Sequence, residues 1–566
     1  MKTFRTLTVL LLGATLLLAK NPKIATDLNG VNGSTTVNVI VQFNTPPTKD
    51  DLKQLGPYGQ MKKIFNGINA VMIPLQVSKL ATIAANPNIR FISPDRTVKG
   101  AMDLTAAAVR AAAAVSYGLN GTGVGIAVID SGVTLKNDLR APGGGASRIV
   151  YSEDFTGLGS TDDAYGHGTH VAGIAAGNGG TSKLSMDTRT FQGIAPNANI
   201  INLRVLDSNG AGADSNVIAG IEQAIALKSL YNIRVISMSL GRGVSESYTL
   251  DPMCQAVEEA WRAGIVVVVA AGNEGRNNNG GIGGYGTIAA PGDDPYVITV
   301  GAMNTVGTPD RGDDKMASYS SKGPTLYDHI VKPDIVAPGN QVASLLSSHS
   351  ATLFTQNPTT QLLNSYYVNG GIGTSTDYYM LSGTSMATPV VSGAAALLIQ
   401  QNPSITPDQV KARLMKTAYK SFPTVTTATD PSTGIIYTSY YDIFTVGAGY
   451  LDIQAALASA DLATLPAMSP AVQLDPVTGL VTLVAGTNVV WGDNVVWGDN
   501  VVWGDCVLLA NNVVWGDNVV WGDQTTAGFN VVWGDGTKGT IDPYNVVWGD
   551  NVVWGDSLKI AVSGEK

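Results

Sequence analysis

The sequence predicts an α/β fold whose central feature is a mainly parallel sheet covered by helices on both faces. Runs of strand length rich in apolar residues are typical of strands buried on both faces. Five of them occur, at 124–130, 200–206, 234–240, 265–271 and 296–301. Stretches patterned as helices lie between them, notably 216–229 and 253–263. This alternation favours a parallel sheet in a large domain, which we place at residues 105–460.

Residues 36–100 are predicted to form a small α+β unit of their own. Five segments alternate between strand and helix patterning, in the order 37–43, 49–55, 65–75, 78–85 and 89–94. The small unit therefore precedes the large domain in the chain.

The start of the chain has the features of a secretory signal. Two basic residues, Lys2 and Arg5, precede an apolar core over 7–19 that is short for a membrane span. We expect a signal peptide at 1–22 and a secreted protein, either extracellular or at the periplasm or cell surface. The net charge is −9 and basic clusters are lacking, which argues against nucleic acid as a partner. Two cysteines, Cys254 and Cys506, provide no disulfide framework.

Residues 465–566 form a repeat region. The hexapeptide Asn-Val-Val-Trp-Gly-Asp occurs eight times and holds eight of the nine tryptophans, starting at 488, 494, 500, 512, 518, 530, 545 and 551. An even period keeps the faces of a strand constant, and each Gly-Asp favours a turn. Three interpretations stay open: a β-repeat that associates with itself, a ligand-binding module, or a disordered tail. The prolines at 466 and 470 suggest that a linker precedes the repeats.

Ser385 is the first candidate for chemistry. It lies in the small-residue run 381–389, directly before an apolar, Ala-rich segment at 390–399. A serine hydroxyl is a weak nucleophile unless a base takes its proton and donors hold the oxyanion that it creates. The N-terminus of a following helix would offer free N–H groups for that purpose.

Three further residues complete a catalytic set. His167 lies in a small-residue motif with His170, and Asp130 and Asn273 end two of the apolar strands, where open α/β sheets place their sites. Taken singly, Asp130 and Asn273 could be turn or cap residues, and Ser385 a helix cap. The two histidines could be a metal pair, but no third ligand accompanies them at a suitable spacing.

Together, these motifs closely resemble the subtilase family of serine peptidases. The chain order Asp130, His167, Ser385 is that of subtilisin. The resemblance implies a three-layer subtilisin-like fold, with Ser385 as nucleophile, His167 as general base and Asp130 as the acid that orients it. It also implies that Asn273 donates to the oxyanion beside the Ser385 N–H, and that His170 is not catalytic.

The resemblance further implies where substrate binds. Two edges would pair with an extended peptide, Ser239-Leu240-Gly241 and Ala211-Gly212-Ala213. Main-chain pairing of this kind does not depend on the side chains of the substrate, so broad specificity is expected. Ala271 and Gly272 would line an open pocket with Glu274 at its rim, although Glu274 could equally be a solvated loop charge.

By the same resemblance, residues 36–100 are an inhibitor-type propeptide that assists folding and is cut off by the enzyme itself. No cofactor is required. The loop 179–191 departs from the family's calcium loop, so a strong calcium site is not expected there, but Asp and Asn residues elsewhere leave calcium binding open. The segment 345–379 lengthens the approach to Ser385 and is expected to form a hairpin or flap.

We therefore expect a secreted serine endopeptidase that acts on proteins and peptides and matures itself. Its partners would be those substrates and its own propeptide, with self-association or surface binding through the repeats. Two alternatives remain: a processing peptidase of narrow specificity, and a repeat-bearing binding or scaffold protein whose peptidase domain is inactive.

Overall fold

The computed structural model describes residues 21–25, 28, 31–65, 69–94, 104–278, 282–430, 433–474, 481–484, 507–508, 512–515, 519–522 and 565. The chain divides into two compact units, residues 1–99 and 100–566, and each is described by itself. Nearly all of the expected signal peptide and most of the repeat region, Cys506 included, lie outside the described residues.

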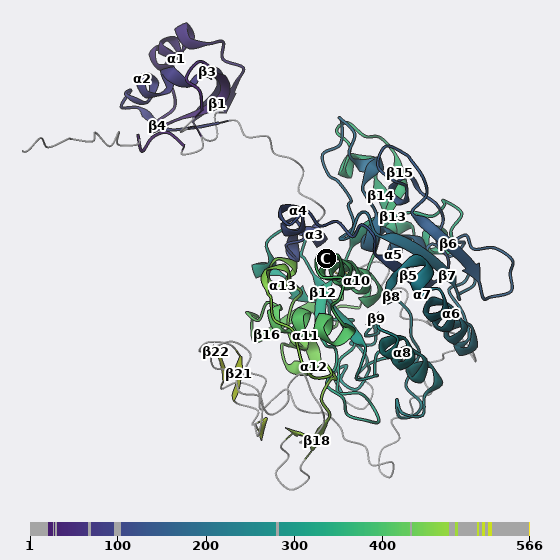
Figure 1. Ribbon diagram of the computed structural model, residues 1–566. Helices are drawn as coiled ribbons and strands as arrows, with labels where there is room; N and C mark the ends of the chain where they lie inside the picture. The colour runs from purple at the N-terminus through teal and green to yellow at the C-terminus, as the bar shows by residue number, and fades with distance from the viewer. Residues whose placement is uncertain are drawn as a thin grey trace, which may run out of the picture. The chain divides into compact units, whose positions relative to one another are not determined.

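The first unit is a four-stranded antiparallel sheet with two helices (Figure 1). Its elements are β1 Thr36–Phe43, α1 Lys49–Leu55, β2 Lys63–Phe65, β3 Ala70–Gln76, α2 Leu80–Ala84 and β4 Ile89–Pro94. The strand expected over 65–75 is wrong as a single element, because β2 pairs with β3 in antiparallel fashion. Asn69, with φ 49°, has a left-handed conformation that a continuous strand excludes.

The second unit is built on an eight-stranded sheet. Its strands are β5 Gly125–Asp130, β6 Ile149–Asp154, β7 Asn199–Arg204, β8 Ile233–Met238, β9 Val266–Ala270, β10 Ile298–Asn304, β11 Lys315–Met316 and β12 Ile335–Pro338. They follow the order β11-β10-β9-β8-β5-β7-β6, with β12 also on β10. Among these described strands, only the β10–β11 pair is antiparallel. The predicted α/β class with a mainly parallel sheet is confirmed.

Helices cover both faces of this sheet (Figure 1). Those of the unit are α3 Leu104–Ala108, α4 Ala113–Ser116, α5 His167–Ala176, α6 Asp214–Ala226, α7 Lys228–Tyr231, α8 Pro252–Arg262, α9 Thr352–Gln356, α10 Thr384–Gln401, α11 Pro407–Thr417, α12 Ile443–Val446 and α13 Ile453–Ala458. Gly220 of α6 approaches Ile129, whereas Ser392 of α10 bonds Ser237, the register partner of Val128. Since Val128 and Ile129 point to opposite faces, α6 and α10 do too. The helix expected over 216–229 is two helices, α6 and α7.

The segment expected to form a hairpin or flap is a small antiparallel sheet. Strands β13 Val342–Leu345, β14 Gln361–Leu363 and β15 Thr374–Leu381 pair in the order β13-β15-β14. Strand β13 packs on α5. The aromatic rings of Phe191, Tyr367 and Tyr378 lie within 5.5 Å of one another, centre to centre, and anchor the small sheet to the loop 179–191.

The segment expected to be a linker is instead packed into the second unit. Ala467 and Ser469 are buried. The Val331 N–H donates to the Pro470 carbonyl at 2.8 Å, and the Val472 N–H donates to the His329 carbonyl at 2.9 Å. The prolines here fit a packed extended segment, so the second unit continues past residue 470.

The other described strands form small antiparallel sheets of two or three strands. They are β16 Val425–Thr429 with β17 Ile436–Tyr440, β18 Val472–Leu474 with β19 Val481–Leu483 and β20 Val507–Leu508, and β21 Asn512–Trp515 with β22 Val519–Gly522. The last pair joins the repeats that begin at 512 and 518 in antiparallel register, with Val513 opposite Trp521.

Candidate active site

Asp130 and His167 form the charged centre of the candidate site. Asp130 is the last residue of β5, and His167 is the first residue of α5. His167 Nδ1 lies 2.8 and 3.0 Å from the two carboxylate oxygens of Asp130, which is fully buried. Burial lowers the pKa of His167, but the Asp130 charge and its hydrogen bond outweigh that effect, so the pKa is raised above the ordinary value.

A second buried carboxylate, Asp163, fixes the start of α5. It accepts bonds of 2.7 and 2.8 Å from the N–H groups of Gly166 and Thr169, and 2.8 Å from the Ser131 hydroxyl. Ser131 in turn contacts Asp130 at 3.2 Å. Sequence reasoning missed Asp163, because it lies three residues before the N-cap residue Gly166 and so outside the position where an Asp signals a helix start.

Ser385 lies in the first turn of α10, which begins one residue earlier at Thr384. Its hydroxyl donates to the Ser239 carbonyl at 3.2 Å, and the Ser239 hydroxyl donates to the Ser385 carbonyl at 2.7 Å. Gly383, with φ 142°, leads into the helix in a conformation that side chains disfavour. The helix expected over the Ala-rich segment from 390 therefore begins six residues earlier, and the serine itself lies at the helix N-terminus.

Asn273 faces this helix end from the loop after β9. Its Oδ1 accepts from Thr384 N at 2.9 Å and lies 3.2 Å from the Thr384 hydroxyl. Its Nδ2 is buried and has no hydrogen-bond partner among the residues that the structure describes. A buried amide donor left unpaired is costly, and such a donor beside Ser385 is suited to hold a developing negative charge.

His170 lies in the core rather than at the site. It is fully buried, donates through Nε2 to the Val342 carbonyl at 3.0 Å, and meets the Tyr379 ring edge-on at 5.0 Å. Burial, with the charge of His167, lowers the pKa of His170 to about 3. The imidazole is thus held neutral and serves packing.

The residues expected to bind substrate differ in burial and in their contacts with the candidate catalytic residues. Ser239 touches Ser385 directly, and Leu240 is buried. A Cβ on Gly241 would come within 2.9 Å of the Ala290 carbonyl. Ala271 is buried and pairs with Val300 through its N–H at 3.0 Å.

The remaining expected substrate contacts lie on two loops. Gly272 donates to the Thr384 hydroxyl at 3.2 Å, and Glu274 is half-buried with its N–H on the Ser321 hydroxyl. Ala211, Gly212 and Ala213 are half-buried in the turn before α6. Asp207 shapes that turn, because its carboxylate accepts from Ala211 N at 3.0 Å.

The residues at the loop 179–191 do not fit a calcium ion. Asp138, the buried carboxylate there, already accepts from Thr181 N at 2.8 Å and from the Tyr378 hydroxyl at 2.6 Å. Lys183 of the same loop supplies a cation; burial lowers its pKa, and the Asp138 charge acts in the opposite direction. Within the described ranges, no group of three or more His, Cys, Asp or Glu is arranged to hold a metal ion.

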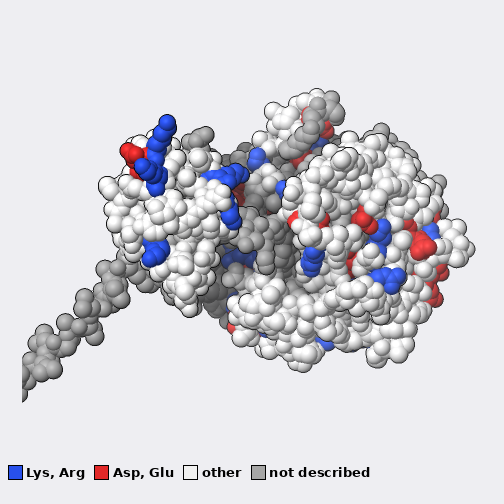
Figure 2. Space-filling view, turned by 90° about the horizontal axis from the view of Figure 1, so that it is seen from above, with Lys and Arg blue, Asp and Glu red and all other residues white. Residues whose placement is uncertain are grey.

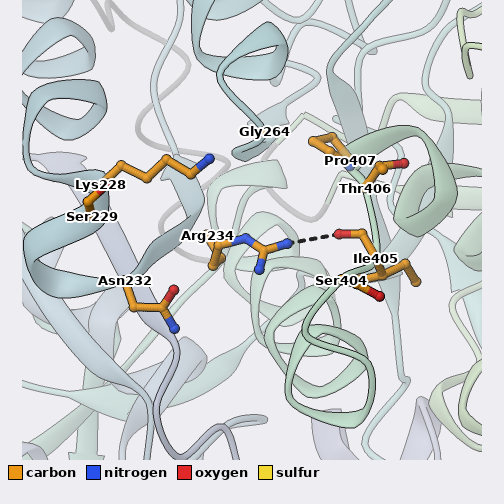
Figure 3. Close-up of a pocket in the computed structure, with 9 residues that line it drawn as sticks. All are labelled: Lys228, Ser229, Asn232, Arg234, Gly264, Ser404, Ile405, Thr406 and Pro407. Carbon is orange, nitrogen blue, oxygen red and sulfur yellow. Dashed lines mark hydrogen bonds between the residues drawn. The ribbon is translucent and has the colours of Figure 1, made fainter.

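A pocket of about 310 Å³ lies at the N-terminal ends of β8 and β9 (Figure 3). It is lined by residues that begin β8 and β9 and by the turn before α11, and Arg234 crosses it to the carbonyls of Pro403 and Ile405 at 2.7 and 2.8 Å. None of the candidate catalytic residues lines it, and the Arg234 guanidinium is already bound by these carbonyls.

The surface in view carries scattered charges. Figure 2 shows Lys, Arg, Asp and Glu side chains interspersed on a largely uncharged face, as expected with 14% charged residues. In the part of the chain that the structure covers, no helix combines the length and the apolar character needed to cross a membrane.

Comparison with known proteins identifies the family. The subtilase family profile matches residues 121–437. Serine protease AprX of Bacillus subtilis is 38% identical over 398 residues, 67% of this chain and 82% of the relative. Subtilisin E of the same species is 34% identical over 375 residues, 65% and 80% of the two chains. A crystal structure of a cold-adapted subtilisin-like serine proteinase is 31% identical, covers 54% and 85% of the two chains, and has a TM-score of 0.36.

The chain therefore belongs to the subtilase family of serine peptidases. It is a serine-type endopeptidase, and its substrates are proteins or peptides.

Proposed function

We propose that this endopeptidase works through Asp130, His167 and Ser385, with Asn273 and the Ser385 N–H holding the oxyanion. The Nδ2 of Asn273, unpaired within the described residues, is the observation that carries the proposal. Ser385 Oγ attacks the substrate carbonyl and gives its proton to His167 Nε2, while Asp130 stabilises the imidazolium. His167 then protonates the leaving amine, and water hydrolyses the acyl ester by the reverse steps.

The proposal extends to substrate binding. Ser239–Gly241 and Ala211–Ala213 would pair with the peptide backbone, and Ala271, Gly272 and Glu274 would line the pocket for the residue before the cut. Support comes from the position of Ser239 against Ser385 and of Gly272 against Thr384. Neither edge presents a side chain that would select one sequence, which favours broad specificity.

The maturation proposal rests on the first unit. Residues 36–100 would act as an inhibitory propeptide after loss of a signal peptide at 1–22, and the mature enzyme would be secreted. We propose no cofactor in the reaction, because the four catalytic groups supply base, nucleophile and oxyanion donors. Calcium at the loop 179–191 is disfavoured because the Asp138 carboxylate already accepts from Thr181 N and from the Tyr378 hydroxyl.

A fluorophosphonate probe tests the catalytic assignment. The mature enzyme produced from the full chain should be labelled at Ser385, and the Ser385→Ala variant should show no labelling. The same variant should accumulate with the first unit attached, which N-terminal sequencing reads directly. Labelling that persists in Ser385→Ala would refute the nucleophile, and a processed Ser385→Ala chain produced without added protease would refute self-maturation.

A further inference from the structure

Glu565, the penultimate residue of the chain, lies in a built site on the second unit. Its carboxylate Oε1 accepts from Arg276 Nη2 at 2.9 Å and from Ser318 N at 2.9 Å, and the Ser318 hydroxyl also donates to it. Its side chain is only 7% exposed. A carboxylate this buried is tolerated because a cation and several N–H and O–H donors surround it.

The backbone of Glu565 is also hydrogen-bonded to the second unit. The Asn340 side chain donates through Nδ2 to the Glu565 carbonyl at 2.9 Å and accepts from the Glu565 N–H at 2.8 Å. This two-bond pairing is the same that a neighbouring strand would offer. Together with the carboxylate contacts, it defines a site for a glutamate residue within an extended peptide.

Arg276 is prepared for this ligand by its other contacts. Its Nη1 pairs with Asp430 at 2.9 Å, its Nε donates to the Ser318 hydroxyl at 2.7 Å, and the Tyr437 ring lies 4.6 Å from the guanidinium. The guanidinium is therefore fixed in place, which lowers the entropy that binding a carboxylate would otherwise cost.

The site shares its supports with the candidate active site. Arg276 follows Asn273 by three residues, and Gly275 N bonds the Tyr319 carbonyl at 2.8 Å. The Tyr319 hydroxyl donates to Gly339, whose carbonyl also accepts from Gly383 N at 2.8 Å. The loop that carries Asn273 and the residue Gly383 just before α10 are thus linked to the glutamate site.

We propose that the second unit carries a binding site for a glutamate within an extended peptide and fills it with Glu565 of its own chain. Ser469 and Glu565 are both buried, and the eight repeats lie between these two positions in the sequence. Arg276, Ser318 and Asn340 form the acceptor.

Hydrogen exchange tests the capture in the full chain. In a Ser385→Ala background, which prevents self-cleavage, Glu565→Gln should speed exchange in the peptide that contains Ser318 by about 10-fold or more, because a charge-assisted bond is lost. Asp556→Asn removes the same charge nine residues earlier and should change nothing there. Equal exchange in the parent and Glu565→Gln chains would overturn the proposal.

A peptide in trans tests the chemistry of the site. A fluorescein-labelled peptide of residues 560–566 should bind the full-length Ser385→Ala/Glu565→Ala chain at least about 10-fold more tightly than the same peptide with the Glu565→Gln substitution. Adding Asn340→Ala to the full-length chain should abolish the binding. Equal binding of the two peptides would overturn the proposal, as would Ser318 protection that depends on protein concentration, since Glu565 would then come from a second copy.

Discussion

Asn273 accepts the backbone N–H of Thr384 at 2.9 Å through Oδ1, and this bond orients its buried Nδ2, which has no partner in the described part of the chain. The two ends of one amide thus have separate tasks. Oδ1 holds the start of α10, and in the proposed mechanism Nδ2 donates to the oxyanion that forms only during the reaction.

Asn273→Ala should lower kcat by roughly 10²–10³-fold with little change in KM, the scale of one oxyanion donor. Asn273→Asp keeps an acceptor for Thr384 N but lacks the N–H donor, so its kcat should fall at least as far. Steady-state kinetics on a peptide substrate measure both. An Asn273→Asp enzyme with nearly full kcat would show that only the Thr384 contact matters.

The pH dependence of kcat/KM should reflect the raised pKa of His167. The base must be neutral to accept a proton, so activity should rise with pH through a midpoint above about 6.5. Asp130→Asn should lower kcat by roughly 10⁴-fold and move that midpoint down, since the charge that outweighs burial is gone. A midpoint unchanged in Asp130→Asn would contradict the pairing as the cause.

His170 should make the protein sensitive to acid. Its pKa is about 3 when folded and about 6.5 when unfolded, so between these values only the unfolded chain binds the proton. The free energy of unfolding is then intact above about pH 6.5 and falls as pH drops toward 3. In the Ser385→Ala background, His170→Gln should make the fall of Tm with decreasing pH shallower. His349→Gln replaces an exposed histidine and should leave that fall unchanged.

The Tyr379 hydroxyl donates to the carbonyl of Gly166, the residue before His167. Tyr379→Phe removes a buried hydrogen bond to the carbonyl at the start of α5, so kcat should fall by about 3- to 10-fold and Tm should fall too. Tyr378→Phe is the matched control, because its hydroxyl bonds Asp138 instead. The Tm of Tyr378→Phe should fall while its kcat stays unchanged. Equal losses of kcat in the two variants would show that any disturbance of the small sheet lowers kcat.

The sequence predicted the features that are local in the chain. Strands of the main sheet are buried on both faces, so each is a continuous apolar run that can be recognised without knowing its neighbours. The candidate catalytic residues are likewise recognisable because close backbone approach requires small residues beside them. Gly168 is one example, since a Cβ there would lie 2.2 Å from the Gly132 carbonyl.

What only the tertiary structure decided are contacts between segments far apart in sequence. No periodic pattern in the sequence predicts the hydrogen bonds between Asp163 and Ser131, between Tyr379 and Gly166, or between Glu565 and Arg276 across 289 positions. The segment 464–470 shows the same limit, because prolines suit a linker and a packed extended strand equally well. Composition and spacing report the preferences of single segments, whereas burial of Ser469 or Glu565 depends on which partner the folded chain brings to them.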